Sequence, residues 1–194
     1  MSDKHNKPAS ENMSMNFSKG WGIILYQALM FFLLIGFSID GLNIVAPAFS
    51  EASGVDYPSV LSMATIAGFI GIVVYIFAGR VNVKIGPRLM SGACLIGAGL
   101  SYIFLGHTST LVTYCIALTL VTCFINSAAY IAGNTLIAQW FPKKKGLANG
   151  FTTMGHNCGS AFYVPLVSAA IAAFGFANGL SLLAVIAIVL GVAG

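Results

Sequence analysis

The sequence predicts an all-α membrane protein, built as a bundle of six transmembrane helices. The chain is 58% hydrophobic and 7% charged, with a mean hydropathy of +0.90, whereas a soluble domain carries roughly 25% charged residues. Its nine Lys and Arg residues fall in three short clusters, each separated from the next by two apolar segments. This composition leaves too little polar surface to cover a water-soluble globule.

Six segments are long enough, or nearly so, to cross a bilayer. A hydrocarbon core about 30 Å thick needs roughly 20 helical residues. The predicted spans are 21–46, 59–79, 88–106, 110–138, 147–173 and 177–194, of which the sixth barely reaches this length. Residues 1–20 precede the first span, are polar and lack apolar periodicity. We expect them to form a disordered cytoplasmic tail.

The positive charges predict the orientation of the spans. The three clusters are Lys4, Lys7 and Lys19; Arg80, Lys84 and Arg88; and Lys143, Lys144 and Lys145. Because Lys and Arg are retained on the cytoplasmic side during insertion, all three clusters should lie there. The loop before the second span carries Glu51 and Asp56 but no Lys or Arg, and we expect it outside. We therefore predict an integral protein of the inner or plasma membrane with a cytoplasmic amino terminus.

The composition argues against nucleic acid and metal as partners. The net charge of +4 resides in short loop clusters and forms no basic face, so no nucleic-acid binding is expected. The cysteines lie inside apolar segments without metal-ligand spacing, and we expect neither a metal nor another cofactor. They are Cys94, Cys115, Cys123 and Cys158.

Small residues one helical turn apart occur in three of the predicted spans. The pairs are Gly68 with Gly71, Ala93 with Gly97, and Gly155 with Gly159. Such pairs let helix backbones approach closely in lipid. Because the chain contains 22 glycines, these spacings also arise by chance, and both interpretations stay open.

The loop between the second and third spans carries a motif. Residues 79–88 read Gly-Arg-Val-Asn-Val-Lys-Ile-Gly-Pro-Arg. This stretch resembles the signature loop of the major facilitator superfamily, G-x-x-x-D-R-x-G-R-R, at the same place between two helices. The matching residues are Gly79, Lys84, Gly86 and Arg88. Val83 replaces an acidic residue that in the family helps latch the two halves together, and Pro87 replaces a basic one.

The loop between the fourth and fifth spans carries a second motif. Residues 140–150 read Trp-Phe-Pro-Lys-Lys-Lys-Gly-Leu-Ala-Asn-Gly. They are similar to the W-F-P-x-K/R-K/R-G-x-A-x-G loop of the same superfamily. The matching residues that we single out are Trp140, Phe141, Pro142, Gly146 and Gly150. With two such loops at the right separation, the chain resembles the amino-terminal six-helix half of a facilitator-superfamily carrier.

The sequence lacks two motifs that mark particular branches of the superfamily. Thr119 stands where many proton-coupled members carry a membrane Arg, and Ser160 follows Gly159 where drug/proton antiporters have Gly-Pro. The chain is therefore most similar to the branch of oxalate/formate antiporters and monocarboxylate carriers. The resemblance implies secondary active transport of a small solute, such as a mono- or dicarboxylate, by alternating access. Protons or a counter-transported anion would be the coupling partners.

Asp40 is the only acidic residue inside a predicted span, and it shares a helical stripe with Gly36, Asn43 and Pro47. An ionised group inside the hydrocarbon is costly and indicates a functional role. Asp40 and Asn43 are therefore candidates for binding a proton or orienting a substrate in a central cavity. The alternative is an interfacial carboxylate near the outer mouth, about 9 Å from the midpoint of the span.

The fourth span carries Asn126, Tyr130 and Asn134 at i, i+4 and i+8, a spacing that predicts one polar face. This face would either line an aqueous cavity and bind the substrate or bond to neighbouring helices. Asn126 lies near mid-membrane and is the best candidate substrate contact. Asn134 lies nearer the cytoplasm, and we expect it to be structural.

His156 lies about ten residues into the fifth span, near mid-depth. A histidine there would titrate near neutral pH and serve proton coupling, or would remain neutral and donate to a backbone carbonyl. The interior of every predicted span lacks Lys and Arg. A carboxylate substrate would therefore need a positive partner from elsewhere.

The predicted spans amount to one half of a carrier. Carriers of this family have two six-helix halves with the substrate site between them. The sixth span ends at Gly194 without a following basic loop, so we expect a truncated chain that needs a carboxy-terminal half. One alternative is a non-transporting or dimerising six-span protein. Another is an intramembrane enzyme, which the sequence disfavours because the Gly-x-Ser stretch 36–40 lacks a closing glycine.

Overall fold

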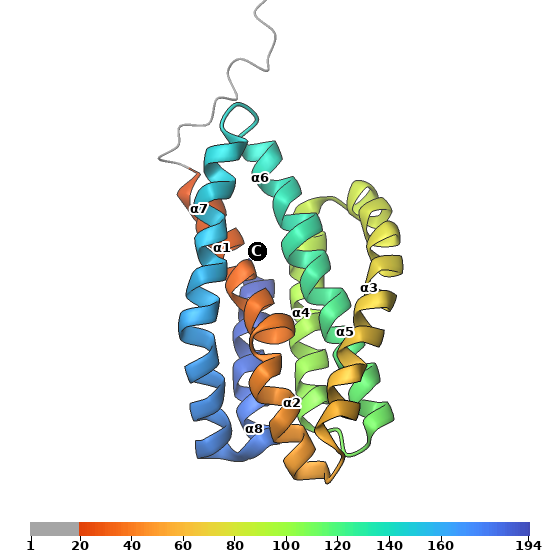
Figure 1. Ribbon diagram of the computed structural model, residues 1–194. Coiled ribbons are helices and arrows are strands. Elements are labelled where there is room, and N and C mark those ends of the chain that lie inside the picture. The colour runs from red at the N-terminus through yellow and green to blue at the C-terminus, as the bar shows by residue number, and fades with distance from the viewer. Residues whose placement is uncertain (1–19) are drawn as a thin grey trace, which may run out of the picture.

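The computed structural model describes residues 20–194, and this part of the chain is a bundle of long helices joined by short turns (Figure 1). The predicted tail, residues 1–20, lies outside the described residues except for Gly20. Five helices are long and apolar enough to cross a membrane: Trp21–Ser53, Tyr57–Ile85, Pro87–Gly106, Leu111–Trp140 and Lys145–Ala193. The last of these contains both of the final two predicted spans.

The first long helix consists of α1 (Trp21–Leu34), a π-helical segment η2 (Ile35–Ile39) and α2 (Leu42–Ser53). It continues beyond the predicted end at residue 46 even though Pro47 lies inside α2. Gly54 ends it in the left-handed conformation, with a φ of 72°. A residue without a Cβ atom adopts this conformation at no steric cost, which is why glycine so often follows a helix.

The second and third long helices are α3 (Tyr57–Ile85) and α4 (Pro87–Gly106). Asp56 caps the first turn of α3 by accepting a hydrogen bond from the Ser59 backbone N–H at 3.0 Å. Gly86 alone separates the two helices, with φ 86° and ψ 151°. Pro87 then starts α4 at a position where a missing N–H costs nothing.

The fourth long helix consists of α5 (Leu111–Asn126), the π-helical segment η3 (Ser127–Gly133) and α6 (Asn134–Trp140). A reciprocal capping box between Thr110 and Thr113 starts α5. After α6, a short turn leads to α7 (Lys145–Cys158), the π-helical segment η4 (Gly159–Tyr163) and α8 (Val164–Ala193).

Helix α8 contains a break at Gly175, where φ is 79° and ψ is 168°. A Cβ atom built on Gly179 would lie 2.8 Å from the carbonyl oxygen of Ala170. In a straight helix Ala170 and Gly179, which are nine positions apart in the sequence, would lie about 13 Å apart along the axis. The chain therefore reverses at Gly175, and α8 consists of a first arm (164–174) and an antiparallel second arm (176–193) (Figure 1).

Two close helix contacts hold the bundle together. The second arm of α8 packs against α4 so tightly that a Cβ atom on Gly92 would lie 2.7 Å from the carbonyl oxygen of Gly191. Helix α7 packs against α1 with Gly155 directly on the backbone of Ala28. Small residues permit this approach where lipid removes the usual hydrophobic drive for helices to pair. Of the three predicted small-residue pairs, Gly155 with Gly159 makes such contacts, whereas Gly68 faces open space.

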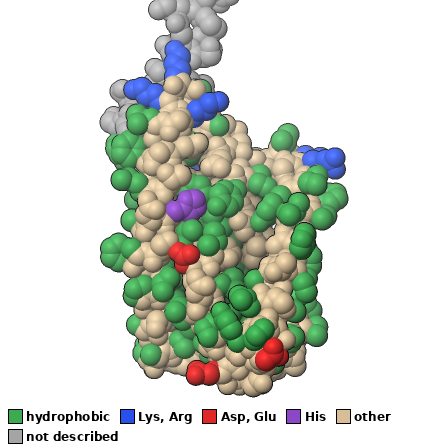
Figure 2. Space-filling view, viewed as in Figure 1, with side chains coloured by type: hydrophobic (Ala, Val, Ile, Leu, Met, Phe, Trp, Pro, Cys, Tyr) green, Lys and Arg blue, Asp and Glu red, His purple; other side chains and the backbone are tan. Residues whose placement is uncertain are grey.

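The charged side chains separate along the bundle axis (Figure 2). Lys and Arg gather at one end, which we call the basic end, and Asp and Glu lie mainly toward the opposite end. The basic end contains the α3–α4 junction and the turn between α6 and α7. The opposite end contains the turn at Gly54 and the reversal at Gly175. This is the distribution that membrane insertion imposes on a helical bundle.

Candidate functional site

Three π-helical segments lie within the bundle, two of them in contact with each other and all of them on or beside the first long helix. Segment η2 contacts η4, and α1 contacts both η3 and η4. A π-helical turn bonds residue i to i+5 and occurs preferentially at functional sites. In η2, for example, the Asp40 N–H donates to the carbonyl oxygen of Ile35 at 2.9 Å. The polar residues predicted from the sequence lie within or beside these three segments.

The π-helical segment η3 separates the polar residues of the fourth long helix. Asn126 is buried at 8% exposure, and its side-chain amide donates to the carbonyl oxygen of Thr122 at 2.7 Å. Tyr130 is exposed at 42%. Asn134 is half-buried and accepts from the side chain of Gln27 at 3.4 Å. Tyr130 and Asn134 thus both contact α1, at Phe31 and Gln27, whereas Asn126 bonds within its own helix.

His156 lies in a cluster of three rings. Its ring centroid is 4.3 Å from that of Phe31 and 6.2 Å from that of Tyr130. Phe31 and Tyr130 are themselves 5.7 Å apart. The Nε2 atom of His156 is buried and has no hydrogen-bond partner among the described residues. A buried polar atom without a partner is unusual, and it marks this ring as a candidate contact for a ligand.

Asp40 and Asn43 lie on the side of the site away from the basic end. Asp40 directly follows η2 and is half-buried, while Asn43 is exposed on the first turn of α2. Nine residues separate Asp40 from Phe31, which places Asp40 about 13 Å farther along the bundle axis than His156. The structure thus supplies two titratable groups at two depths.

Gln27 belongs to the same region, although the sequence analysis did not select it. It is fully buried, and its Nε2 atom donates to the carbonyl oxygen of Ala129 in η3 at 2.8 Å. Its Oε1 atom is buried without a partner and lies against Gly133. A polar residue inside an apolar span would have been the signal to find it. It couples α1 to the π-helical segment of the fourth long helix.

The first signature loop lies at the basic end. Gly79 is in α3 and faces open space, and Lys84 is exposed in the last turn of that helix. Gly86 forms the junction described above. Arg88 is in the first turn of α4, where its Nε atom donates to the carbonyl oxygen of Gly194 at 2.7 Å. Asn82, which lies between these residues, is buried and donates to Thr135 Oγ1 at 3.0 Å, joining α3 to α6.

The second signature loop lies at the same end. Trp140 ends α6, and Pro142 lies in the following turn. Phe141 is buried in a small cluster with Ile24, Ile137 and Ala148. Gly146 and Gly150 are in α7 and face open space. The loop therefore anchors the start of α7 to the start of α1 through one aromatic side chain.

The sequence of this chain is similar to known proteins. The family model of the Major Facilitator Superfamily matches residues 18–194, and the chain belongs to that family. It is also 37% identical, over 87 residues, to a protein named oxalate:formate antiporter from Oxalobacter formigenes. That match covers 44% of this chain and 20% of the antiporter, so the chain spans only a fraction of the relative's length.

Family membership confirms the predicted resemblance. The chain is an integral membrane protein of a transporter family, with apolar helices long enough to cross the bilayer. Membership of this family indicates a transporter and argues against the alternative of an intramembrane enzyme.

Proposed function

We propose that this chain forms the amino-terminal half of a secondary carrier for a small organic anion, such as a mono- or dicarboxylate. In this proposal the two arms of α8 are separate membrane crossings, so that six helices span the membrane. The basic end and the amino terminus face the cytoplasm, and the membrane is the inner or plasma membrane. The antiporter relative, whose name gives oxalate and formate, supports this substrate class.

The proposal depends chiefly on one observation, namely that titratable and aromatic side chains lie beside π-helical segments. His156 offers an unpartnered Nε2 atom next to the rings of Phe31 and Tyr130. Asp40 offers a half-buried carboxylate farther from the basic end. We assign Asp40 and His156 to proton coupling or to orienting the substrate. We assign Tyr130 to the lining of the substrate path, and Asn43, exposed on the first turn of α2, to its outer part. Asn126, which is buried and bonded within its own helix, would reach the substrate only after a change of conformation.

The substrate's charge requires a partner outside these helices. Among residues 20–194, every Lys and Arg lies near the basic end, in the last two turns of α3, the first turn of α4 or residues 143–145. A carboxylate at mid-depth would remain unpaired there, which is unfavourable. We therefore propose that a carboxy-terminal half contributes the positive group. Alternating access would bring the two halves together around the substrate.

The test is transport by proteoliposomes that contain a full-length carrier with this half. Radiolabelled oxalate or formate should enter vesicles preloaded with the unlabelled anion, and Asp40→Asn should abolish uptake. The matched control is Glu51→Gln, which removes a carboxylate at the far end of the same long helix. Wild-type uptake with unchanged pH dependence in Asp40→Asn would contradict the role of Asp40. Transport by the 194-residue chain alone would instead favour the dimerising alternative.

A further inference from the structure

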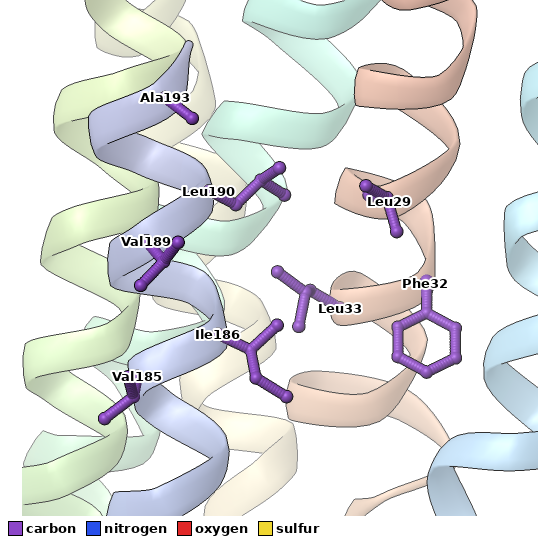
Figure 3. Close-up of a pocket in the computed structure, with 8 residues that line it drawn as sticks. All are labelled: Leu29, Phe32, Leu33, Val185, Ile186, Val189, Leu190 and Ala193. Atoms are coloured by element: carbon purple, nitrogen blue, oxygen red, sulfur yellow. The ribbon is translucent and has the colours of Figure 1, made fainter.

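A groove runs between α1 and the second arm of α8 (Figure 3). It has a volume of 380 Å³ and is lined only by apolar side chains. Leu29, Phe32 and Leu33 of α1 line one side of the groove, and Ile186 and Leu190 of the second arm point toward them. A carboxylate or other polar solute in this groove would leave its polar atoms unpaired. The groove therefore suits a hydrocarbon chain.

The length of the groove fits one leaflet of a bilayer. Eight residues separate Val185 from Ala193, which corresponds to about 12 Å along the helix axis. This is less than half of a hydrocarbon core about 30 Å thick. Ala193 lies at the basic end, so the groove extends from that end toward mid-depth.

A second, more polar pocket continues the groove at the basic end. It has a volume of 320 Å³ and shares Ala193 with the groove. Tyr26, Arg88 and Trp140 line it. Tyr26 lies on α1 one turn before Leu29, so the pocket and the groove follow the same side of that helix.

The polar groups of this pocket suit an anionic head group. The Tyr26 hydroxyl donates to Ser91 Oγ at 3.2 Å. The Arg88 side chain donates from Nε to the carbonyl oxygen of Gly194, and this is the one hydrogen bond of its guanidinium group recorded within residues 20–194. The remaining guanidinium N–H groups can bind a phosphate in a bidentate manner. Trp140 is of the type that lies at the membrane interface.

We propose that this groove and pocket form a binding site for an anionic glycerophospholipid. One acyl chain lies along α1 and the second arm of α8, and the phosphate binds Arg88 beside Tyr26. The bound lipid fills the space between the first long helix and the second arm, two elements that otherwise meet across an apolar gap. The proposal does not depend on the transported substrate and stands even if the carrier moves another solute.

Native mass spectrometry of the purified 194-residue chain tests the head-group contact. The probes are phosphatidylglycerol and phosphatidylcholine with identical acyl chains. We expect tighter binding of phosphatidylglycerol, because the choline cation of phosphatidylcholine offsets the charge of its phosphate. Arg88→Gln should weaken phosphatidylglycerol binding about fivefold and phosphatidylcholine binding less. Arg80→Gln is the matched control, because Arg80 is exposed at the same end but does not line the pocket. Equal affinity of the wild-type chain for the two lipids would overturn the proposal. An equal loss of phosphatidylglycerol affinity in Arg88→Gln and Arg80→Gln would overturn it as well.

Filling the groove tests the acyl-chain contact. Ile186→Phe places a ring in the groove and should reduce binding of both lipids. The control is Ile70→Phe on α3, where Ile70 is exposed at 44%, against 43% for Ile186. Undiminished lipid binding in Ile186→Phe would contradict the assigned path of the chain.

A measurement on the wild-type chain tests the same site without depending on whether the variants fold. A phosphatidylglycerol that carries a photoreactive diazirine in its acyl chain should label residues 29–33 and 185–193 preferentially. Labelling spread evenly over α3 and α5, whose apolar side chains are also exposed, would show an ordinary lipid annulus and no specific site.

Discussion

The side-chain amide of Gln27 donates a hydrogen bond to the carbonyl oxygen of Ala129 across 2.8 Å, joining α1 to the π-helical segment η3. Gln27 is fully buried, and Ala129 is buried beside it. A π-helical segment distorts the regular hydrogen-bond ladder of a helix. A side-chain donor from a neighbouring helix is one way to satisfy a carbonyl there, and it fixes the distance between the two long helices.

Replacing Gln27 should therefore loosen this junction. Gln27→Leu removes the donor to Ala129 and should lower the free energy of unfolding by about 1 kcal/mol, since interhelical hydrogen bonds in membranes average about 0.6 kcal/mol and reach about 1.7. Thermal unfolding of the purified chain in detergent measures this. Gln139→Leu is the control, because Gln139 is exposed near the end of α6 and should change the midpoint little. Equal midpoints for both variants would refute a structural role for the Gln27 amide.

The contact between α7 and α1 should tolerate no added methyl group. A Cβ atom on Gly155 would collide with the carbonyl oxygen of Ala28, so Gly155→Ala forces the helices apart. Overpacking of this kind costs about 1–3 kcal/mol. Gly150→Ala, on the same helix, faces open space and should stabilise α7 by about 0.5–1 kcal/mol. Denaturation with sodium dodecyl sulfate measures both, and an order of stability opposite to this would show that α7 is not packed as described.

The junction between α3 and α4 should require glycine. Gly86 adopts φ 86° and ψ 151°, a conformation close to a region that other residues almost never enter. Gly86→Ala should cost about 1–3 kcal/mol. Gly79→Ala, seven residues earlier in α3, meets no atom within 4 Å and should have the opposite sign. Thermal unfolding of the two variants measures this. An unchanged unfolding midpoint in Gly86→Ala would contradict the requirement for glycine at this junction.

The cap of α3 should make the chain sensitive to acid. Hydrogen bonds from the side chain and backbone of Ser59 lower the pKa of Asp56 below its ordinary value. Because the pKa is lower in the folded state, this stabilisation is present above the unfolded pKa of about 3.9 and is lost as the pH falls below it. Asp56→Asn keeps a capping oxygen but removes the titration.

Hydrogen exchange of the first turn of α3 at pH 6 and pH 3 measures this effect. After correction for the intrinsic exchange rate, protection should fall at the lower pH in the wild-type chain and change less in Asp56→Asn. Because Asp56 is fully exposed, we expect a local effect near Ser59 and little change in global unfolding. Equal pH dependence in the two proteins would exclude Asp56 as the titrating group.

The helical class, the basic loops and the family were predictable from the sequence. Apolar segments and clustered charges carry this information locally, because the bilayer acts on each segment separately. Asp40, Tyr130 and His156, which were selected from the sequence, lie within or beside the π-helical segments. Their roles remain predictions until transport is measured.

The register of the polar residues was not predictable. Asn126 was the best expected substrate contact, yet it is buried and bonds to its own helix at Thr122. Gln27 was overlooked, yet it is the buried polar residue that reaches η3. The cause is the same in both cases. Three π-helical segments shift the faces of three long helices, and no local spacing rule reveals where such segments occur.

The sequence by itself determined that this chain is a helical membrane protein of a transporter family with two motif loops at its basic end. The hydrophobic free energy of each segment decides that outcome without reference to the others. Only the tertiary structure decided which polar side chains lie beside the π-helical segments and which residues form the pocket around Arg88. Those features depend on contacts between helices far apart in the chain, such as Gln27 with Ala129 and Gly155 with Ala28.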